Sequence, residues 1–446
     1  MFSVDFRSLA LLRIGLGLLL FFDTLDRLGG FKFHYTSEGF IEFHPPFGVF
    51  PFYSLHQLSG SPIFQGLLFG ILLVASFALA VGFWSRTSVV ICAVMTLSLQ
   101  HHAPQLLYGG DGVTRILLLI AMFLPIGRRY SVDATLNRTQ DDGAIENVAS
   151  AALLAQVITI HLAAFWHKAT SSEWLLGEGV RQSVRAFPTS LGQALLSIDV
   201  LLAPLNYLVM ASQLLFPLML LLSWRWRFAG ALALIALHLG VGLFIEVGQF
   251  PWLMISSVLV FLPKQAFDWD WSASRVFPKT SPSLIATAAT VGLVLPNLSE
   301  SRLVTKPNMM TQTMTMFGLQ QDWSMFVPLP QYVGWLSVRG KFPDGRIWDL
   351  HANTEFRGWR RPQSYKIPAY IRWGSLGHSL SLNPPALDRM PERVCEFWNG
   401  RENPAVSSVT VTMVSVNVNH LNSVPPKYFS YLESQRNCGN AQASHP

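Results

Sequence analysis

The sequence has 446 residues, of which 50% are hydrophobic and only 13% are charged, and its mean hydropathy is +0.34. Soluble domains carry roughly twice that fraction of charged residues, so the composition excludes a wholly soluble protein. The net charge of +6 arises mainly from basic residues in loops beside hydrophobic runs. That distribution is typical of orientation in a bilayer. No basic run is interleaved with base-stacking aromatics, so no nucleic-acid partner is expected.

Nine segments before residue 300 are apolar enough to be candidate membrane spans. A spanning helix needs about 20 mostly apolar residues, and the segments at 113–127, 250–263 and 283–297 are short. Each of these three is either extended by flanking residues or a buried helix that does not fully cross. We therefore expect an α-helical polytopic bundle of about nine helices over residues 1–300, with an uncleaved first span. The nine candidates are 8–28, 64–84, 88–104, 113–127, 149–168, 199–222, 228–247, 250–263 and 283–297.

The basic residues of the loops are distributed unequally between the two sides of the membrane. With the N-terminus inside, the inner loops carry Arg7, Arg86, Arg128, Arg129, Arg138, Arg225, Arg227, Lys264, Arg275 and Lys279. The outer loops carry Lys32, Lys168, Arg181 and Arg185. Because cytoplasmic loops are enriched in Lys and Arg, we expect a multi-pass protein of a bacterial inner membrane. Its N-terminus is expected to be cytoplasmic, and everything after Asn297 is expected outside.

Residues 308–446 have a different pattern, with more charge and shorter apolar runs. Apolar residues alternate with polar ones from Val409 to Val418, which is typical of a strand. Shorter strand-like runs at 332–339 and 346–351 flank the turn signal Pro343-Asp344-Gly345. We expect a small, β-rich extracytoplasmic domain over this segment.

Two of the three cysteines are expected to form a disulfide. Cys395 and Cys438 both lie in the segment expected outside, where an oxidising compartment permits the bond. Cys92 lies in an apolar run and is expected to be a small core residue. The sequence has neither a C-x-x-C motif nor a Cys/His cluster, so no metal is expected.

Ionisable residues inside spans are costly and are functional candidates for that reason. Arg13 lies near the inner end of the first span, where its side chain is expected to snorkel to the interface. His161 and Lys168 are seven residues apart, so they lie on one helix face, about 10 Å apart along the axis. Lys168 is either an interface anchor beside Trp174 or a desolvated amine that acts as a base. His238, in the middle of a span, either makes a structural hydrogen bond between helices or lines a pocket.

Several short motifs follow one another in order along residues 1–330. They are Phe6-Arg7-Ser8-Leu9-Ala10, Arg13-Ile14-Gly15, Tyr35 with Gly39, Tyr108-Gly109-Gly110-Asp111-Gly112, Leu124-Pro125, Tyr130-Ser131-Val132-Asp133, Lys168 with Trp174 and Gly177, His238 with Gly248-Gln249-Phe250-Pro251, and Gln321-Asp322-Trp323-Ser324-Met325-Phe326. In this order the chain resembles the horizontally transferred transmembrane domain family, which includes the vitamin K-dependent gamma-carboxylases.

The resemblance implies a catalytic role for Lys168, which matches the family's base. In the carboxylases that lysine deprotonates reduced vitamin K, the oxygenated quinone removes a proton from glutamate, and carbon dioxide adds to the carbanion. His238 stands ten residues before Gly248, the spacing at which the carboxylases have a histidine before Gly-Met-Phe. Lys168, His238 and His161 are therefore the candidate catalytic residues. Arg128 stands where the animal enzymes carry a histidine tied to carboxylation, and this departure counts against glutamate carboxylation.

Two functions of different classes remain open. The first is a carboxylase-like enzyme that uses reduced vitamin K or another quinol at an outward-facing pocket, with Lys168 as the base. The second is a non-enzymatic membrane protein that acts in the maturation of, or immunity to, an exported peptide, with Lys168 as an anchor. A transporter is a third and weaker hypothesis, because the sequence lacks inverted repeats and paired broken helices.

Overall fold

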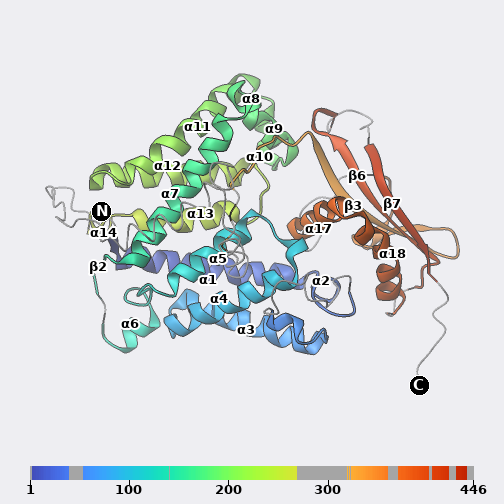
Figure 1. The fold of residues 1–446 in the computed structure, drawn as a ribbon, viewed down its shortest axis with the longest axis horizontal. Helices are drawn as coiled ribbons and strands as arrows, with labels where there is room; N and C mark the ends of the chain where they lie inside the picture. The colour runs from blue at the N-terminus through green and yellow to red at the C-terminus, as the bar shows by residue number, and fades with distance from the viewer. Residues whose placement is uncertain are drawn as a thin grey trace, which may run out of the picture. The chain divides into compact units, whose positions relative to one another are not determined.

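The computed structural model describes residues 3–39, 54–139, 141–268, 319, 321, 323–359, 370–400, 404–420 and 428–438. The chain divides into two compact units, each assembled from separate stretches of sequence (Figure 1). The first unit, the helical unit, contains residues 1–23, 71–97 and 109–330. The second, the sheet unit, contains residues 24–70, 98–108 and 331–446.

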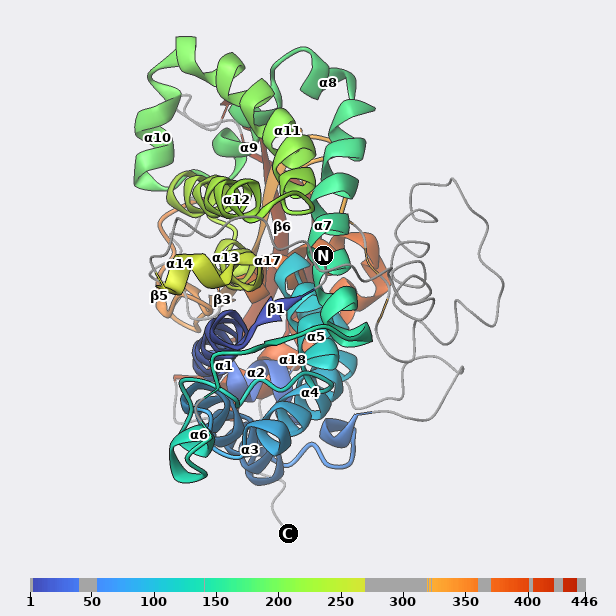
Figure 2. The same cartoon turned by 90° about the vertical axis from the view of Figure 1, so that its left-hand side faces the viewer.

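Five helices are long and apolar enough to cross a membrane. They are α1 (Phe6–Leu28), α3 (Pro62–Val81), α7 (Val148–Ala169), α11 (Leu202–Met219) with the preceding turn η3 (Asp199–Leu201), and α12 (Trp224–Phe244). Each overlaps a predicted span, which confirms the helical membrane fold class. Helices α11 and α12 lie side by side in both Figure 1 and Figure 2, and α7 packs against α11.

Three further predicted spans correspond to shorter or more polar helices. These are α4 (Ser85–His102), α5 (Gly109–Ala121), and α13 (Phe250–Val258) continued by η4 (Leu259–Phe261). The 13 residues of α5 are well below the roughly 20 that a spanning helix needs. The predicted span at 283–297, together with Arg275 and Lys279, lies outside the described residues.

Short elements connect the long helices. Strand β1 (Val4–Asp5) pairs antiparallel with β2 (Ala144–Ile145), next to α7 in the sequence. The other short elements are α2 (Phe31–Tyr35), η1 (Leu55–Gln57), η2 (Pro104–Leu106), α6 (Val132–Leu136), α8 (Ser172–Leu175), α9 (Gly179–Ala186), α10 (Ser190–Leu196) and α14 (Lys264–Asp268).

Small residues bring helices of the helical unit into close contact. A Cβ placed on Gly17 of α1 would lie 2.5 Å from the backbone nitrogen of Ala80 in α3. A Cβ on Gly15 would lie 2.3 Å from the hydroxyl of Ser256 in α13. Since lipid gives helices no hydrophobic reason to associate, such close packing is what holds them together.

The side chain of Arg13 differs from the prediction. It is only 1% exposed, and its guanidinium donates hydrogen bonds to the carbonyl oxygens of Ile126, Arg129 and Tyr130 in the loop between α5 and α6. A buried guanidinium needs such acceptors, so Arg13 fixes that loop against α1. The prediction that Arg13 snorkels is therefore wrong.

The C-terminal part of the sheet unit is a five-stranded antiparallel sheet with the order β5-β4-β3-β6-β7. The long strand β3 contains the predicted run at 332–339, and β6 contains the predicted run at 409–418 except for Val418, which begins η6. Strand β4 lies in the predicted run at 346–351. Gly345 has a φ of +89° in the predicted turn before β4, a backbone conformation that favours glycine. The strands are β3 (Tyr332–Lys341), β4 (Ile347–Asp349), β5 (Thr354–Glu355), β6 (Ser408–Asn417), followed by η6 (Val418–His420), and β7 (Tyr428–Asn437).

Two helices cover this sheet and were not predicted. Helix α17 (Tyr370–Leu382) packs on β3, and α18 (Pro384–Asn399) packs on β6 and β7. Cys395 of α18 is bonded to Cys438, which follows β7, with a Cα–Cα distance of 5.5 Å. The predicted disulfide is thus confirmed, and it ties α18 to the edge strand of the sheet.

Candidate active site

Helix α7 carries Lys168 in its last turn. The helix begins at a capping box, in which the Asn147 side chain accepts from the backbone N–H of Ser150 while the Ser150 hydroxyl accepts from the backbone N–H of Asn147. Its long apolar run then continues to Ala169. The Lys168 side chain is only 3% exposed, whereas an anchoring lysine extends its ammonium group into the headgroup region.

The amine of Lys168 is surrounded by carbonyl oxygens and an aromatic ring. Its Nζ atom lies 3.4 Å from the carbonyl oxygen of Ala164 and 3.4 Å from that of Met325. It also lies 4.9 Å from the centre of the Trp174 ring, within the range of a cation–π contact. Among the described residues, no carboxylate lies within 4.0 Å of Nζ. Both hydrogen bonds are long, which leaves the amine weakly held.

The segment 321–329, in which every residue except 322 is described, contacts α7 at two positions. Gln156 and Gln321 exchange hydrogen bonds between their amides, at 2.5 Å and 3.3 Å, and Trp323 donates to the Gln321 oxygen at 3.0 Å. Further along the segment, Met325 contacts Lys168 through its carbonyl group. The segment therefore contacts α7 near its middle, at Gln156, and in its last turn, at Lys168.

Trp174 is buried, although its position after α7 is typical of an interface aromatic. Its indole N–H donates to the carbonyl oxygen of Phe326 at 2.9 Å, and its own carbonyl accepts from the Asn206 amide at 2.9 Å. Gly179 lies against the ring, because a Cβ there would come within 2.2 Å of it. The chain turns between α8 and α9 at Gly177, whose φ is +86°. The ring that faces Lys168 is therefore fixed from several sides.

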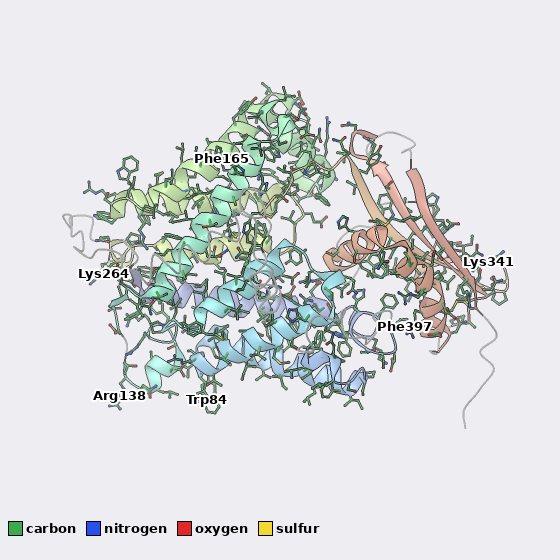
Figure 3. The ribbon with its side chains drawn as sticks, viewed as in Figure 1. Trp84, Arg138, Phe165, Lys264, Lys341 and Phe397 are labelled. Carbon is green, nitrogen blue, oxygen red and sulfur yellow. A yellow bond between two sulfur atoms is a disulfide. The ribbon has the colours of Figure 1, made fainter. Side chains whose placement is uncertain are left out.

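A hydrophobic cluster surrounds this arrangement. Phe165 of α7, labelled in Figure 3, packs against it. Phe326 and Val327 of the segment 321–329 also pack against it. The buried members of the cluster are Trp174, Val180, Val184, Leu202, Met210 and Leu329.

His161 and His238, two predicted site residues from different helices, are in direct contact. Their Nε2 atoms are 3.0 Å apart, and both side chains are buried. The Nδ1 atom of His161 lies 2.7 Å from the Val157 carbonyl oxygen. Because a carbonyl can only accept, His161 Nδ1 carries the proton and its Nε2 accepts from His238. In neutral His238, Nδ1 is then an unprotonated acceptor, and it has no hydrogen-bond partner among the described residues.

The structure thus brings His161 and His238 together and places Lys168 seven residues further along the same helix as His161. Neither imidazole is hydrogen-bonded to Lys168 among the described residues. Gln156 and Asn206, two buried amides that hold this region, are not among the predicted site residues. Their signal was a polar residue inside an apolar span, which is costly in lipid without a partner.

A second group of buried polar side chains lies in the sheet unit and was also missed. His351 stacks on Trp373 with 3.8 Å between the ring centres, and His34 lies 5.8 Å from the same ring. Neither nitrogen of His34 has a hydrogen-bond partner among the described residues. Burial, together with the positive charge of neighbouring residues, lowers the pKa of His34 to about 3, and burial lowers the pKa of His351 to about 4.

The HTTM domain family model matches residues 2–269, which is more than half of the chain. The match extends from β1 through α14. It agrees with the family resemblance that the motifs before residue 269 indicate, while the motif at 321–326 lies beyond the matched residues. Comparison with curated proteins gives no match, and comparison with solved structures gives none either.

Proposed function

The chain belongs to the HTTM domain family, and from this premise we propose that it is a carboxylase-like membrane enzyme in which Lys168 is a general base toward a quinol. The family is linked to vitamin K-dependent carboxylase-like membrane proteins, so reduced vitamin K or another quinol is the proposed co-substrate. The observation that carries the proposal is the burial of the Lys168 amine without a carboxylate within 4.0 Å among the described residues. An anchoring lysine has no reason to be enclosed in this way.

Two nitrogen atoms in this region can accept a proton or a hydrogen bond from a hydroxyl group. The first is the amine of Lys168, which makes only two long contacts. The second is Nδ1 of His238, which is buried and has no partner among the described residues. A quinol carries two hydroxyl groups, so acceptors of this kind fit it. When bound, it would supply the acidic hydroxyl proton that Lys168 accepts.

The residues around Lys168 have complementary roles under this proposal. Trp174 orients the amine from one side, and the segment 321–329 excludes water from the other. His161 holds His238 in the tautomer that presents Nδ1 as an acceptor, since its own Nδ1 is committed to the Val157 carbonyl. The proposal is limited to quinol chemistry, because Arg128 stands at the position where, by the resemblance, the animal carboxylases have a histidine tied to carboxylation.

The disulfide supports the proposed location of the sheet unit. Disulfides persist in oxidising compartments and are rare in the cytosol, and Cys395 is bonded to Cys438. We therefore propose that the C-terminal domain at 308–446, which contains both cysteines, lies on the extracytoplasmic face of a bacterial inner membrane, with the N-terminus in the cytoplasm. An exported peptide or protein is the proposed partner on that face.

Substitution of Lys168→Arg tests the base. Arginine keeps a cation at the helix end but does not deprotonate at accessible pH, so we expect consumption of reduced vitamin K to fall about 100- to 10,000-fold. The assay follows the oxidation of reduced vitamin K by dissolved dioxygen in the presence of detergent-purified protein, after the variant has been matched to wild type in expression and thermal stability. If the variant equals wild type, or wild type is inactive above background, Lys168 is not a base. The maturation or immunity function would then be the better hypothesis.

A further inference from the structure

A cavity of about 480 Å³ lies in the helical unit, between the α3–α4 loop and the loop that joins α5 to α6. It is partly open to the surface, and its walls come from separate parts of the sequence. Phe6 of α1, Phe123 after α5 and Ile145 of β2 form apolar parts of the wall, and Arg86 and Arg128 form basic parts. None of the predicted site residues lines it.

The charge of this cavity is positive. Arg86 and Arg128 are exposed, and neither makes an ion pair or a side-chain hydrogen bond with a described residue. Asp133 is the only acidic residue in its wall. Its two oxygens accept from the backbone N–H of Trp84 and from the N–H and hydroxyl of Ser85, at 2.8, 2.7 and 2.7 Å. The carboxylate is therefore used to cap the start of α4, and the two guanidinium groups remain available.

Aromatic side chains are exposed around the mouth of the cavity. Trp84 and Phe123 are each 67% exposed, and the ring of Phe83 stacks on that of Trp84 with 5.3 Å between centres. Helix α3, one of the spanning candidates, ends at Val81, three residues before Trp84. Figure 3 shows Trp84 and Arg138 near the same end of the helical unit. Exposed aromatics next to the end of a span are typical of the membrane–water interface.

We propose that this cavity binds the headgroup of an anionic phospholipid, with its phosphate between Arg86 and Arg128 and its glycerol and upper acyl chains against Phe123 and Phe6. Guanidinium groups bind phosphate oxygens in a bidentate manner, and basic pockets between membrane helices bind anionic headgroups. A free phosphate ion would leave the exposed apolar rim unexplained, whereas a lipid covers it. The proposal does not depend on the quinol chemistry of Lys168.

Native mass spectrometry of the full-length protein in detergent tests the site, with phosphatidylglycerol and phosphatidylcholine added at equal concentrations. Wild type should retain phosphatidylglycerol preferentially. One arginine near the membrane surface contributes a factor of about five in affinity, so Arg86→Gln and Arg128→Gln should each weaken phosphatidylglycerol binding about fivefold. The double variant should weaken it about 30-fold. All substituted side chains are exposed, so folding should be unaffected, and thermal unfolding checks this.

Arg138→Gln is the matched control, because Arg138 is exposed in the loop after α6 but does not line the cavity. Because Arg138 is not part of the cavity wall, this variant should weaken phosphatidylglycerol binding less than Arg86→Gln or Arg128→Gln does. Equal retention of the two lipids by wild type would overturn the proposal, as would an effect of Arg138→Gln as large as that of Arg86→Gln. Displacement of phosphatidylglycerol by millimolar inorganic phosphate would show a phosphate site in place of a lipid site. Failure of displacement supports the lipid.

Discussion

At the scale of single residues, the polar side chains inside the helical unit differ in how completely they are satisfied. Arg13 donates to three carbonyl oxygens, and Gln156 is paired with Gln321. Lys168 makes only two long contacts, and His238 keeps one nitrogen without a partner among the described residues. Buried polar atoms are normally hydrogen-bonded. Both groups therefore have hydrogen-bonding capacity left for a ligand, as do the Nε atom of Arg13 and the side-chain oxygens of Thr96 and Gln213, which have no partner among the described residues.

In the sheet unit, the buried His34 predicts a dependence of stability on pH. The pKa of His34 is about 3 in the folded protein, because of burial, against a usual value of 6.5. The unfolded chain therefore binds more protons below pH 6.5. The stabilisation is fully present above that pH and is lost as the pH falls toward 3, by about 1.4 kcal/mol per pH unit. Replacing His34 by Phe should remove this one-proton slope, since Phe33, Tyr35 and Trp373 already provide an aromatic environment.

Hydrogen–deuterium exchange of peptides from β3 and α17, measured between pH 6.5 and 4.5 after correction for the intrinsic rate, reports the local free energy of opening. His378→Gln is the control, because His378 is exposed on α17. That variant should keep the wild-type pH dependence. An unchanged slope in His34→Phe would contradict the assignment of His34 as the titrating group.

At the scale of elements, the local sequence pattern was sufficient to predict the long apolar helices and the strands β3, β4 and β6. Their signals, about 20 apolar residues or alternation next to a turn, lie within the element itself. Helix α18 has no such signal, because it begins with two prolines and contains Pro391. Its apolar face becomes evident only against β6 and β7. The contact between His161 and His238 was likewise not predictable from the local sequence, because it joins residues on two helices that are 77 positions apart.

We predict that the segment 321–329 shields the Lys168 amine from solvent. The hydrogen bonds between Gln321 and Gln156 should hold the segment in that position. Substituting Gln321→Ala leaves the buried Gln156 amide and the Trp323 N–H without that acceptor, at a cost of about 1–3 kcal/mol. The segment should then open more often, and Lys168 should react with an amine-directed reagent that hardly labels it in wild type. Lys264, labelled in Figure 3, is the internal control because its side chain is 62% exposed. Its labelling should be equal in both proteins.

Mass spectrometry of labelled peptides separates the two lysines. If Lys168 is protected from labelling equally well in Gln321→Ala and in wild type, the position of the segment 321–329 does not depend on the Gln156–Gln321 amide pair. Increased labelling of both lysines would instead indicate global unfolding.

At the scale of the whole molecule, the loop charges and the disulfide support the same proposed orientation by independent physical arguments. The basic residues of the loops determine orientation during membrane insertion, because basic loops are retained in the cytoplasm. The disulfide acts afterwards, because Cys395 and Cys438 stay bonded only where thiols are oxidised. The assembly of each unit from separate stretches of sequence has no local signal, since it depends on tertiary packing.

The orientation predicts opposite behaviour for two reporter fusions. Alkaline phosphatase joined after Pro446 should be active, because it folds only in an oxidising compartment, whereas a green fluorescent protein at the same position, exported unfolded, should be dark. Fusions placed after Arg138, in a loop predicted to be cytoplasmic, should show the reverse pattern.

Protein purified without reductant should also show no free thiol at Cys395 or Cys438, whereas Cys92 should react once the protein is denatured. An inactive phosphatase at the C-terminus of intact, membrane-inserted protein, together with free thiols at Cys395 and Cys438, would require the opposite orientation. The loop charges would then have to be explained by binding of anionic lipid rather than by topology.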